Sequence, residues 1–245
     1  MTNNLVRNQV SLRLGDYSKS LTILINQAEK FGFSVIVVEN SNSLKLLKSK
    51  INVTHKRLLE SKQLIFMPCN LDKLSLKQGI SSGEHAMLKQ VAQSKIIDNF
   101  DYIWKLTGRL SIGNLNKILI NANGDMVVNH FFTAGHVVDS RFFGMSREVF
   151  KNFAINPPIY SSIIHPFNEI NLHKCFQSME HYLALFATLV ENSNKTVSRL
   201  PQIPLYRGIS GSTGKKLNTV KSIIATRISN FFRKIFIKGL IGIAP

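Results

Sequence analysis

The run Val35-Ile-Val-Val38 constrains the fold more than any other stretch of the chain. Such an unbroken run of β-branched residues is typical of a strand in a parallel sheet, which is buried on both faces. An amphipathic helix is predicted before it over 12–31, with apolar residues at helical spacing and Gly32 at its end. The strand ends in Glu39, so a polar side chain stands at the edge of the sheet where ligands bind in α/β proteins. The sequence therefore predicts an α/β fold.

The rest of the chain continues this alternation of helices and strands. Helices are expected at 44–59, 82–97, 114–120, from Ser146 onward and at 172–190, and strands at 64–67, 101–106, 126–130 and 137–145. A chain of 245 residues suits one domain, with or without an appendage.

Charge limits the class of partner. The chain carries 31 Lys and Arg against 14 Asp and Glu, a formal net charge of +17 at pH 7. Such a surplus attracts nucleic acid, anionic lipid or phosphorylated small molecules. Cys69 and Cys175 are far apart in the chain and lie in no metal-ligand spacing, which favours reduced thiols in a cytosolic setting. We expect neither a signal peptide nor an apolar span of about 18 residues that would cross a membrane.

A second constraint lies at 101–109, where the predicted strand ends in the pair Thr107-Gly108. Glycine adopts backbone conformations that cost other residues more. Lys105 and Arg109 stand on either side of this break. Arg offers a planar fork of donors suited to phosphate or carboxylate, and Lys offers a point charge. The pattern fits either an anion site at the tip of the strand or two solvated cations on a surface turn.

The motif Lys105-Leu-Thr-Gly-Arg109, followed by Ile112 and Asn114, resembles the K-x-T-G-R-Y-x-I-x-N signature of a group of small bacterial glycosyltransferases that make lipopolysaccharide or capsule. The resemblance extends to Gly83-Glu84, to 139–143 and to 208–214, and covers roughly residues 10–215. Leu110 departs from it, because the family has an aromatic residue at that position. The resemblance implies a GT-A-like nucleotide-diphospho-sugar transferase fold, a Rossmann-like mixed sheet flanked by helices.

The resemblance also implies a set of substrate-binding residues. They are Arg13, Glu39, Glu84, Lys105, Thr107, Gly108, Arg109, Asn114, Arg141, Ser210, Gly211 and Ser212. Ordinary alternatives are a surface position for Arg13, a strand-end cap for Glu39 and a carboxylate at a helix start for Glu84. Residues 208–214 form a Gly/Ser loop, suited either to wrapping phosphate with backbone N–H groups or to linking two segments.

Many GT-A enzymes place an Asp-x-Asp metal motif where this chain has its cationic turn, because a divalent cation neutralises the leaving diphosphate. We therefore expect Lys105 and Arg109 to hold the diphosphate. No metal site and no required cofactor are expected, with Mn²⁺ or Mg²⁺ as the alternative. In an inverting transferase a carboxylate takes the proton of the acceptor hydroxyl. Glu180 and Asp139 are the candidates, and Asp139 either pairs with Arg141 across one strand face or lines the cleft.

The predicted glycosyltransferase domain covers 1–215, and 216–245 is a basic amphipathic C-terminal segment, with a helix expected over 219–243. Its apolar residues, such as Ile223 and Phe231, are interleaved with cations such as Arg227 and Lys234. This pattern suits an anionic membrane surface, with packing on the core as the alternative. The expected function is transfer of a sugar from a nucleotide-sugar donor to a glycan or lipid-linked glycan acceptor in lipopolysaccharide, O-antigen or capsule biosynthesis. Such a protein would lie on the cytoplasmic side, peripheral to the inner face of the cell membrane.

Two other functions stay open at this point. A nucleic-acid-binding protein is compatible with the charge, but the cations are not arranged with exposed aromatics along a known motif, so no nucleic-acid partner is expected. A catalytically inactive scaffold of a polysaccharide assembly complex is the other, and the missing aromatic at Leu110 is the one hint of it.

Overall fold

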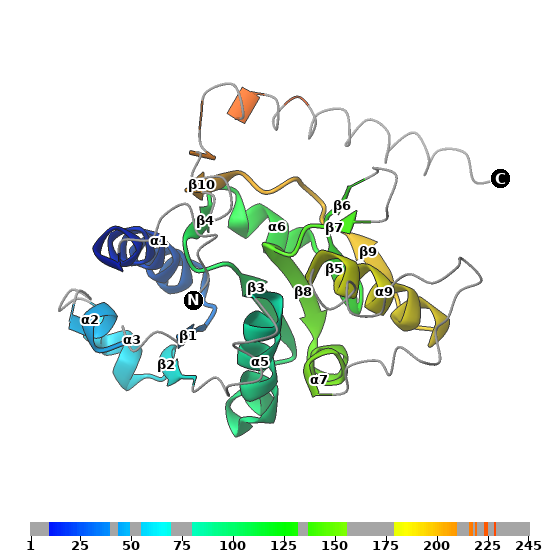
Figure 1. The fold of residues 1–245 in the computed structure, drawn as a ribbon, viewed down its shortest axis with the longest axis horizontal. Coiled ribbons are helices and arrows are strands. Elements are labelled where there is room, and N and C mark those ends of the chain that lie inside the picture. The colour runs from blue at the N-terminus through cyan, green and yellow to red at the C-terminus, as the bar shows by residue number, and fades with distance from the viewer. Residues whose placement is uncertain are drawn as a thin grey trace.

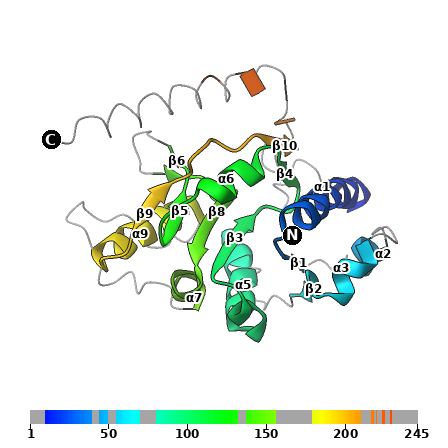
Figure 2. The same ribbon diagram turned by 180° about the vertical axis from the view of Figure 1, so that it is seen from behind.

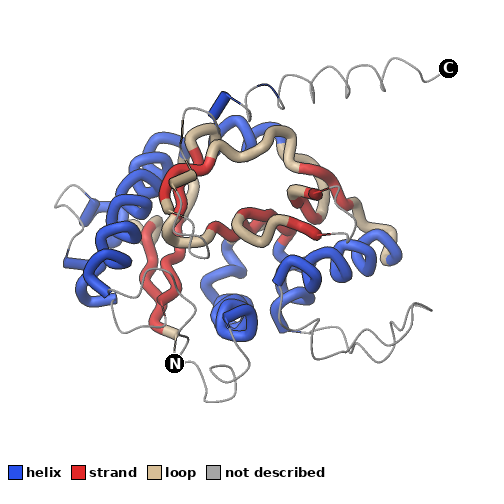
Figure 3. Tube along the Cα trace, turned by 45° about the horizontal axis from the view of Figure 1, so that its top comes forward, coloured by secondary structure: helices blue, strands red, loops and turns tan. Residues whose placement is uncertain are grey.

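The computed structural model describes residues 10–39, 44–49, 55–69, 80–131, 137–155 and 179–209, together with positions 216, 217, 219, 223, 224 and 228. It is a mixed α/β structure in which helices flank the strands (Figures 1 and 3). The helices are α1 (Val10–Phe31), α2 (Leu44–Ser49), α3 (Lys56–Glu60), α5 (Ile80–Gln93), the 3₁₀ helix η2 (Lys95–Asn99), α6 (Leu115–Asn121), α7 (Arg147–Ile155) and α9 (Met179–Asn192). The strands are β1 (Val35–Glu39), β2 (Leu64–Pro68), β3 (Tyr102–Leu106), β4 (Leu110–Ile112), β5 (Met126–Val128), β6 (His130–Phe131), β7 (Val137–Val138), β8 (Phe142–Ser146), β9 (Val197–Arg199) and β10 (Tyr206–Gly208).

The strands form both parallel and antiparallel pairs. The β-branched strand β1 pairs in parallel with β2, as its sequence predicts. The largest sheet has four strands in the order β3-β8-β5-β9, with β3–β8 and β8–β5 antiparallel and β5–β9 parallel. Strands β4 and β10 form a separate antiparallel pair. The predicted α/β class is therefore confirmed, with a mixed arrangement of strands.

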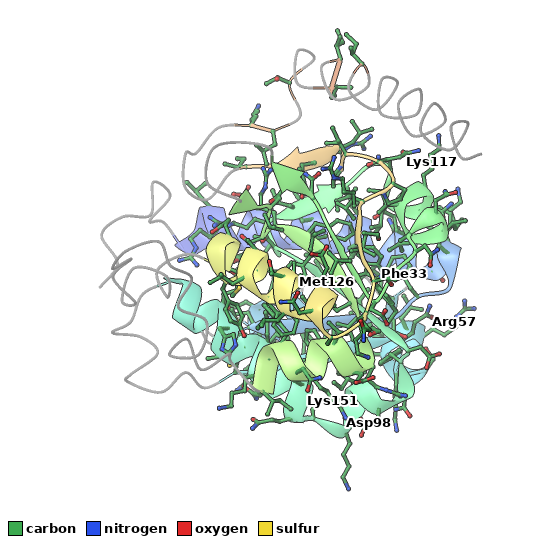
Figure 4. The ribbon with its side chains drawn as sticks, turned by 90° about the vertical axis from the view of Figure 1, so that its right-hand side faces the viewer. Phe33, Arg57, Asp98, Lys117, Met126 and Lys151 are labelled. Carbon is green, nitrogen blue, oxygen red and sulfur yellow. The ribbon has the colours of Figure 1, made fainter. Side chains whose placement is uncertain are left out.

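The four-stranded sheet is covered on both faces, and its side chains alternate between them. Met126, Val128 and Phe143 pack with helices α5, α7 and α9 in one core cluster. Val127 and Phe142 face the opposite side, where they pack with β4 and α6. Met126 is fully buried, and Figure 4 shows it in the interior behind α9. This alternation decides which side chains of β3 reach the candidate site.

Trp104, the one tryptophan of the chain, lies on the α6 side of the sheet. Its ring is stacked on Phe142, with the ring centroids 5.0 Å apart. A Cβ at Gly144, directly across on β8, would lie 2.7 Å from the Trp104 ring. The residue next to it, Lys105, therefore points to the other face, toward α5 and α9, where its Nζ lies 5.7 Å from the Phe143 ring centroid.

Several predicted element bounds are corrected. The helix predicted over 44–59 is two short helices within the described residues, α2 and α3. The strand predicted over 137–145 is broken into β7 and β8 by a turn at 139–141. Helix α5 includes Ile80 and Ser81, so it extends further toward the N-terminus than the predicted start at Ser82.

Some predictions fall outside the described residues. These are the loop residues Ser210, Gly211 and Ser212, Cys175, the first part of the helix predicted over 172–190, and most of the C-terminal helix. Within the described part of the chain, no helix has both the length and the apolar character needed to cross a membrane.

Candidate functional site

Lys105 lies at the centre of a polar cluster at the end of β3. Its ammonium forms an ion pair with Glu84 of α5 and donates to Thr107 Oγ1 (3.2 Å) and to the Ser140 carbonyl (2.5 Å). The Lys105 side chain is only 9% exposed. A lysine ammonium has three N–H donors, and these three acceptors account for all of them. Lys105 thus joins α5, the end of β3 and the 139–141 turn.

This arrangement corrects the role expected for Lys105. An ammonium that is buried, neutralised by Glu84 and fully hydrogen-bonded has no donor left for a diphosphate. The alternative of a carboxylate at a helix start does not hold for Glu84. This residue lies one turn inside α5 and forms an ion pair with Lys105. Both residues belong to the site, where they form its frame.

Glu180 joins the same cluster from α9, in the first turn of the helix that the structure describes. The Ser140 hydroxyl donates to Glu180 Oε1 at 2.5 Å. The Ser140 carbonyl accepts from Lys105, so this one serine connects the two charged side chains. The Glu180 carboxylate is therefore oriented by a residue that Lys105 holds in place.

Asp139 is buried, only 3% exposed, and its carboxylate accepts four hydrogen bonds. Oδ1 accepts from Arg141 N (3.0 Å) and Nε (2.7 Å), and Oδ2 accepts from Arg141 Nη2 (2.8 Å) and the Tyr206 hydroxyl (3.0 Å). These donors occupy the four acceptor positions that a carboxylate has. Asp139 is therefore suited to holding Arg141, and Glu180 is the other carboxylate that the sequence offers as a base.

Arg141 is held by Asp139 and by the ring of Tyr206. Its guanidinium carbon lies 4.4 Å from the Tyr206 ring centroid. Burial disfavours the charged guanidinium, but the hydrogen bond and charge of Asp139 outweigh it, and the pKa of Arg141 is raised. Burial, assisted by the charge of Asp139, also raises the pKa of Tyr206 well above its usual value. The Tyr206 hydroxyl therefore keeps its proton and donates to Asp139.

The turn after β3 is held against two other segments. Thr107 N donates to the Arg141 carbonyl (2.9 Å), and Leu110 N donates to the Thr107 carbonyl (2.9 Å). A Cβ on Gly108 would lie 2.7 Å from Cε1 of Tyr17, so α1 approaches the turn as closely as a glycine allows. Leu110 is 4% exposed and belongs to the core. The side chain at this position therefore does not face a ligand.

Arg13 and Arg109 are two predicted cations whose guanidinium groups include an unpaired buried donor. The Nε atom of each is buried and has no hydrogen-bond partner among the described residues. Arg109 follows Gly108, and Arg13 lies one helical turn before Tyr17, the residue that contacts Gly108. Both arginines thus belong to the region where α1 meets the turn. An unpaired buried guanidinium N–H is costly unless a ligand or water satisfies it.

Two other predicted site residues, Asn114 and Glu39, make contacts away from Lys105. Asn114 is buried, and its side chain donates to Gln202 Oε1 (3.2 Å) and the Ile203 carbonyl (3.1 Å) while accepting from Leu205 N (2.8 Å). It therefore holds 202–205 against the start of α6, which is a structural role. Glu39 ends β1 at the carboxyl edge of the parallel pair, and its carbonyl accepts from Cys69 N (2.8 Å).

Gly208 gives a testable constraint on this region. Its φ of +129° lies in the region that favours glycine, and a Cβ there would overlap the Arg109 carbonyl oxygen. We expect Gly208→Ala to lower the free energy of unfolding by about 1–3 kcal/mol, measured by urea denaturation. Gly15→Ala is the matched control, since nothing lies within 4 Å of a Cβ at that helical position. Equal stability changes in the two variants would contradict this assignment.

Three residues of the site were missed by sequence reasoning: Ser140, Tyr206 and Tyr17. Ser140 lies between Asp139 and Arg141, so the motif already contained it, but its bond to Glu180 spans 40 residues. Tyr206 contacts Asp139 from β10, and Tyr17 contacts Gly108 from α1. No local sequence pattern predicts either contact.

Comparison with known proteins adds no family to this description. No protein-family model and no curated protein sequence matches the chain. Among the described residues, no group of three or more His, Cys, Asp and Glu side chains is placed to hold a metal ion.

Proposed function

We propose that the protein is a glycosyltransferase that moves a sugar from a nucleotide-sugar donor to a glycan acceptor. One observation carries the proposal: residues predicted as a single site from separate parts of the chain form one connected network. Glu84, Lys105 and Thr107 meet at the end of β3, and Ser140 connects them to Glu180. A rigid frame around one carboxylate and beside a cationic turn is suited to group transfer.

The donor diphosphate is assigned to Arg109 and Arg13. Their buried Nε atoms have no partner among the described residues, whereas the Lys105 donors are all used. Arginine binds phosphate oxygens through paired N–H groups, so two guanidinium groups at the α1–turn junction suit a diphosphate. The leaving group is stabilised electrostatically as its negative charge develops. Mn²⁺ or Mg²⁺ is not required in this scheme.

Glu180 is assigned as the general base. It takes the proton of the acceptor hydroxyl while that oxygen attacks the anomeric carbon and the bond from the anomeric carbon to the diphosphate breaks. The Ser140 hydroxyl donates to Oε1 of this carboxylate and so helps to orient it. The scheme describes an inverting reaction, because it uses one displacement and no covalent intermediate.

The finer features of the proposal follow the sequence resemblance. The fold is proposed to be GT-A-like, which the mixed α/β structure is compatible with. The acceptor is proposed to be a lipid-linked glycan of lipopolysaccharide, O-antigen or capsule, reached at the cytoplasmic face of the cell membrane. The alternation of cations and apolar residues at the C-terminus supports membrane association.

Arg109→Ala tests the donor site. We expect it to weaken binding of the preferred nucleotide or nucleotide sugar about 10- to 100-fold, because hydrogen bonds to charged groups are lost. Thermal shift and calorimetry with uridine, cytidine, guanosine and thymidine diphosphate sugars, with and without Mn²⁺, measure this. Arg57→Ala is the control, since Arg57 is exposed and pairs only with Glu29 among the described residues.

The outcome that contradicts the proposal is equally specific. If the folded wild-type protein shows no shift with any of these nucleotides, the donor assignment fails. If a nucleotide binds equally well to wild type and Arg109→Ala, the cationic turn is not the donor site.

A further inference from the structure

Two stretches of the chain carry cations and no acidic residue. Residues 102–124 and 192–245 contain no Asp or Glu at all. The structure brings parts of these two stretches together, because β10 pairs with β4, and α6 follows β4 directly. We call the surface formed by β4, α6, β10 and the described positions of 216–228 the acid-free face.

The hydrogen bonds of this face show that it is one unit. Gly113 N donates to the Leu205 carbonyl (3.0 Å), and Asn114 holds 202–205 through its side chain. Lys216 forms an isolated β-bridge with Ile209, and Leu217 N donates to the Gly208 carbonyl (3.0 Å). These contacts hold Lys216 and Leu217 against the end of β10. Figures 1 and 2 both show the helical residues 223 and 224 on the same side of the molecule as α6.

Large aliphatic side chains protrude from the acid-free face. Ile120 on α6 is 72% exposed, more than any other large hydrophobic residue among those described. Ile224 and Ile228 are each 51% exposed. Lys117 is one turn before Ile120 on α6, is exposed, and lies at the periphery in Figure 4. The surface therefore combines cations with protruding isoleucines.

We propose that the acid-free face is a docking surface for an anionic lipid bilayer, with α6 of the folded core in contact with it alongside the described positions of 216–228. Cations are drawn to the negative surface of such a bilayer, and isoleucine side chains enter the region between headgroups and acyl chains. A second copy of this chain would be repelled by the like charges. Nucleic acid would need aromatic rings for stacking or polar donors, and the protruding residues are aliphatic.

The proposal goes beyond membrane association through the C-terminus, because it assigns a contact to α6. It is also independent of the proposed reaction, since lipid binding is measured without any sugar or nucleotide. A failure of lipid docking would therefore leave the transferase assignment unchanged, and the reverse holds as well.

The test is co-sedimentation of the full chain with vesicles of phosphatidylcholine alone or with phosphatidylglycerol added. Wild type is expected to bind the anionic vesicles, with affinity falling as salt rises. Ile120→Asp is expected to weaken this binding about tenfold, since it puts a charge where the proposal has an apolar side chain entering the bilayer. Leu46→Asp is the matched control, because Leu46 is 52% exposed on α2, beside Lys45.

Each outcome decides the matter. Weakened binding in Ile120→Asp with unchanged binding in Leu46→Asp supports the α6 contact. Equal binding by wild type and Ile120→Asp, or equal weakening in both variants, overturns it. The docking proposal is also overturned if the wild-type protein does not bind anionic vesicles, whether or not it binds oligonucleotides. Circular dichroism checks that both variants fold, which their exposure leads us to expect.

Discussion

Replacing Glu180 by Gln is expected to lower the turnover number by about 10²- to 10⁴-fold, the usual contribution of a general base. The substitution keeps an oxygen that accepts from Ser140, so the frame of the site is preserved. Binding of the nucleotide sugar should change little, because Glu180 acts on the acceptor. Release of the nucleotide from a nucleotide sugar in water measures the effect, since water replaces the acceptor at the same base.

Glu191→Gln provides the control for this prediction. Glu191 lies on the same helix as Glu180, is exposed, and should give wild-type turnover. Turnover of Glu180→Gln within a factor of about 10 of wild type would show that the base is elsewhere, because a general base contributes more than that. Donor binding with no turnover in any variant, wild type included, would favour the scaffold interpretation.

Lys105→Met is expected to destabilise the protein by about 2–3 kcal/mol, because it leaves Glu84 partly buried and without its partner. Breaking a fully buried pair costs about 3–5 kcal/mol, and the 24% exposure of the Glu84 side chain reduces this. For a chain of this size the melting temperature should fall by roughly 5–10 °C. Differential scanning calorimetry measures it.

Lys151→Met is the matched control for Lys105→Met. Lys151 also pairs with a carboxylate, Asp98, at 2.6 Å, but both side chains are well exposed, at 39% and 51%, and they lie together at the lower edge of Figure 4. Exposed pairs contribute about 0–1 kcal/mol. The double variant Lys105→Met with Glu84→Leu should recover part of the loss, since no buried charge remains. A loss in Lys105→Met no larger than that in Lys151→Met would contradict the central role of Lys105.

The fold could be predicted from the sequence where periodicity is strong and local. The helix before Gly32, the parallel strand β1 and the strand β3 lie where their patterns place them, within a few residues. The break at 139–141 was missed because the apolar alternation on both sides of it looks like one strand. The Asp139 side chain binds the Arg141 backbone N–H and turns the chain there, as Asp side chains often do.

The sequence anticipated part of the polar cluster at the end of β3, but not the contacts within it. Glu84, Lys105 and Glu180 do meet, although they are far apart in sequence. Their roles depend on hydrogen bonds between distant elements, which no local pattern encodes. A cation with unpaired donors and one that is already neutralised look alike in a sequence. The distinction between Arg109 and Lys105 therefore required the structure.

The position of Trp104 has a practical consequence as an optical probe. It is the sole indole of the chain, it adjoins Lys105 on β3, and it points to the opposite face of the sheet, against Phe142 and Gly144. Its emission therefore reports the integrity of the sheet and is shielded from direct contact with whatever occupies the other face. A variant that loses turnover while keeping the wild-type emission spectrum has lost chemistry and not structure.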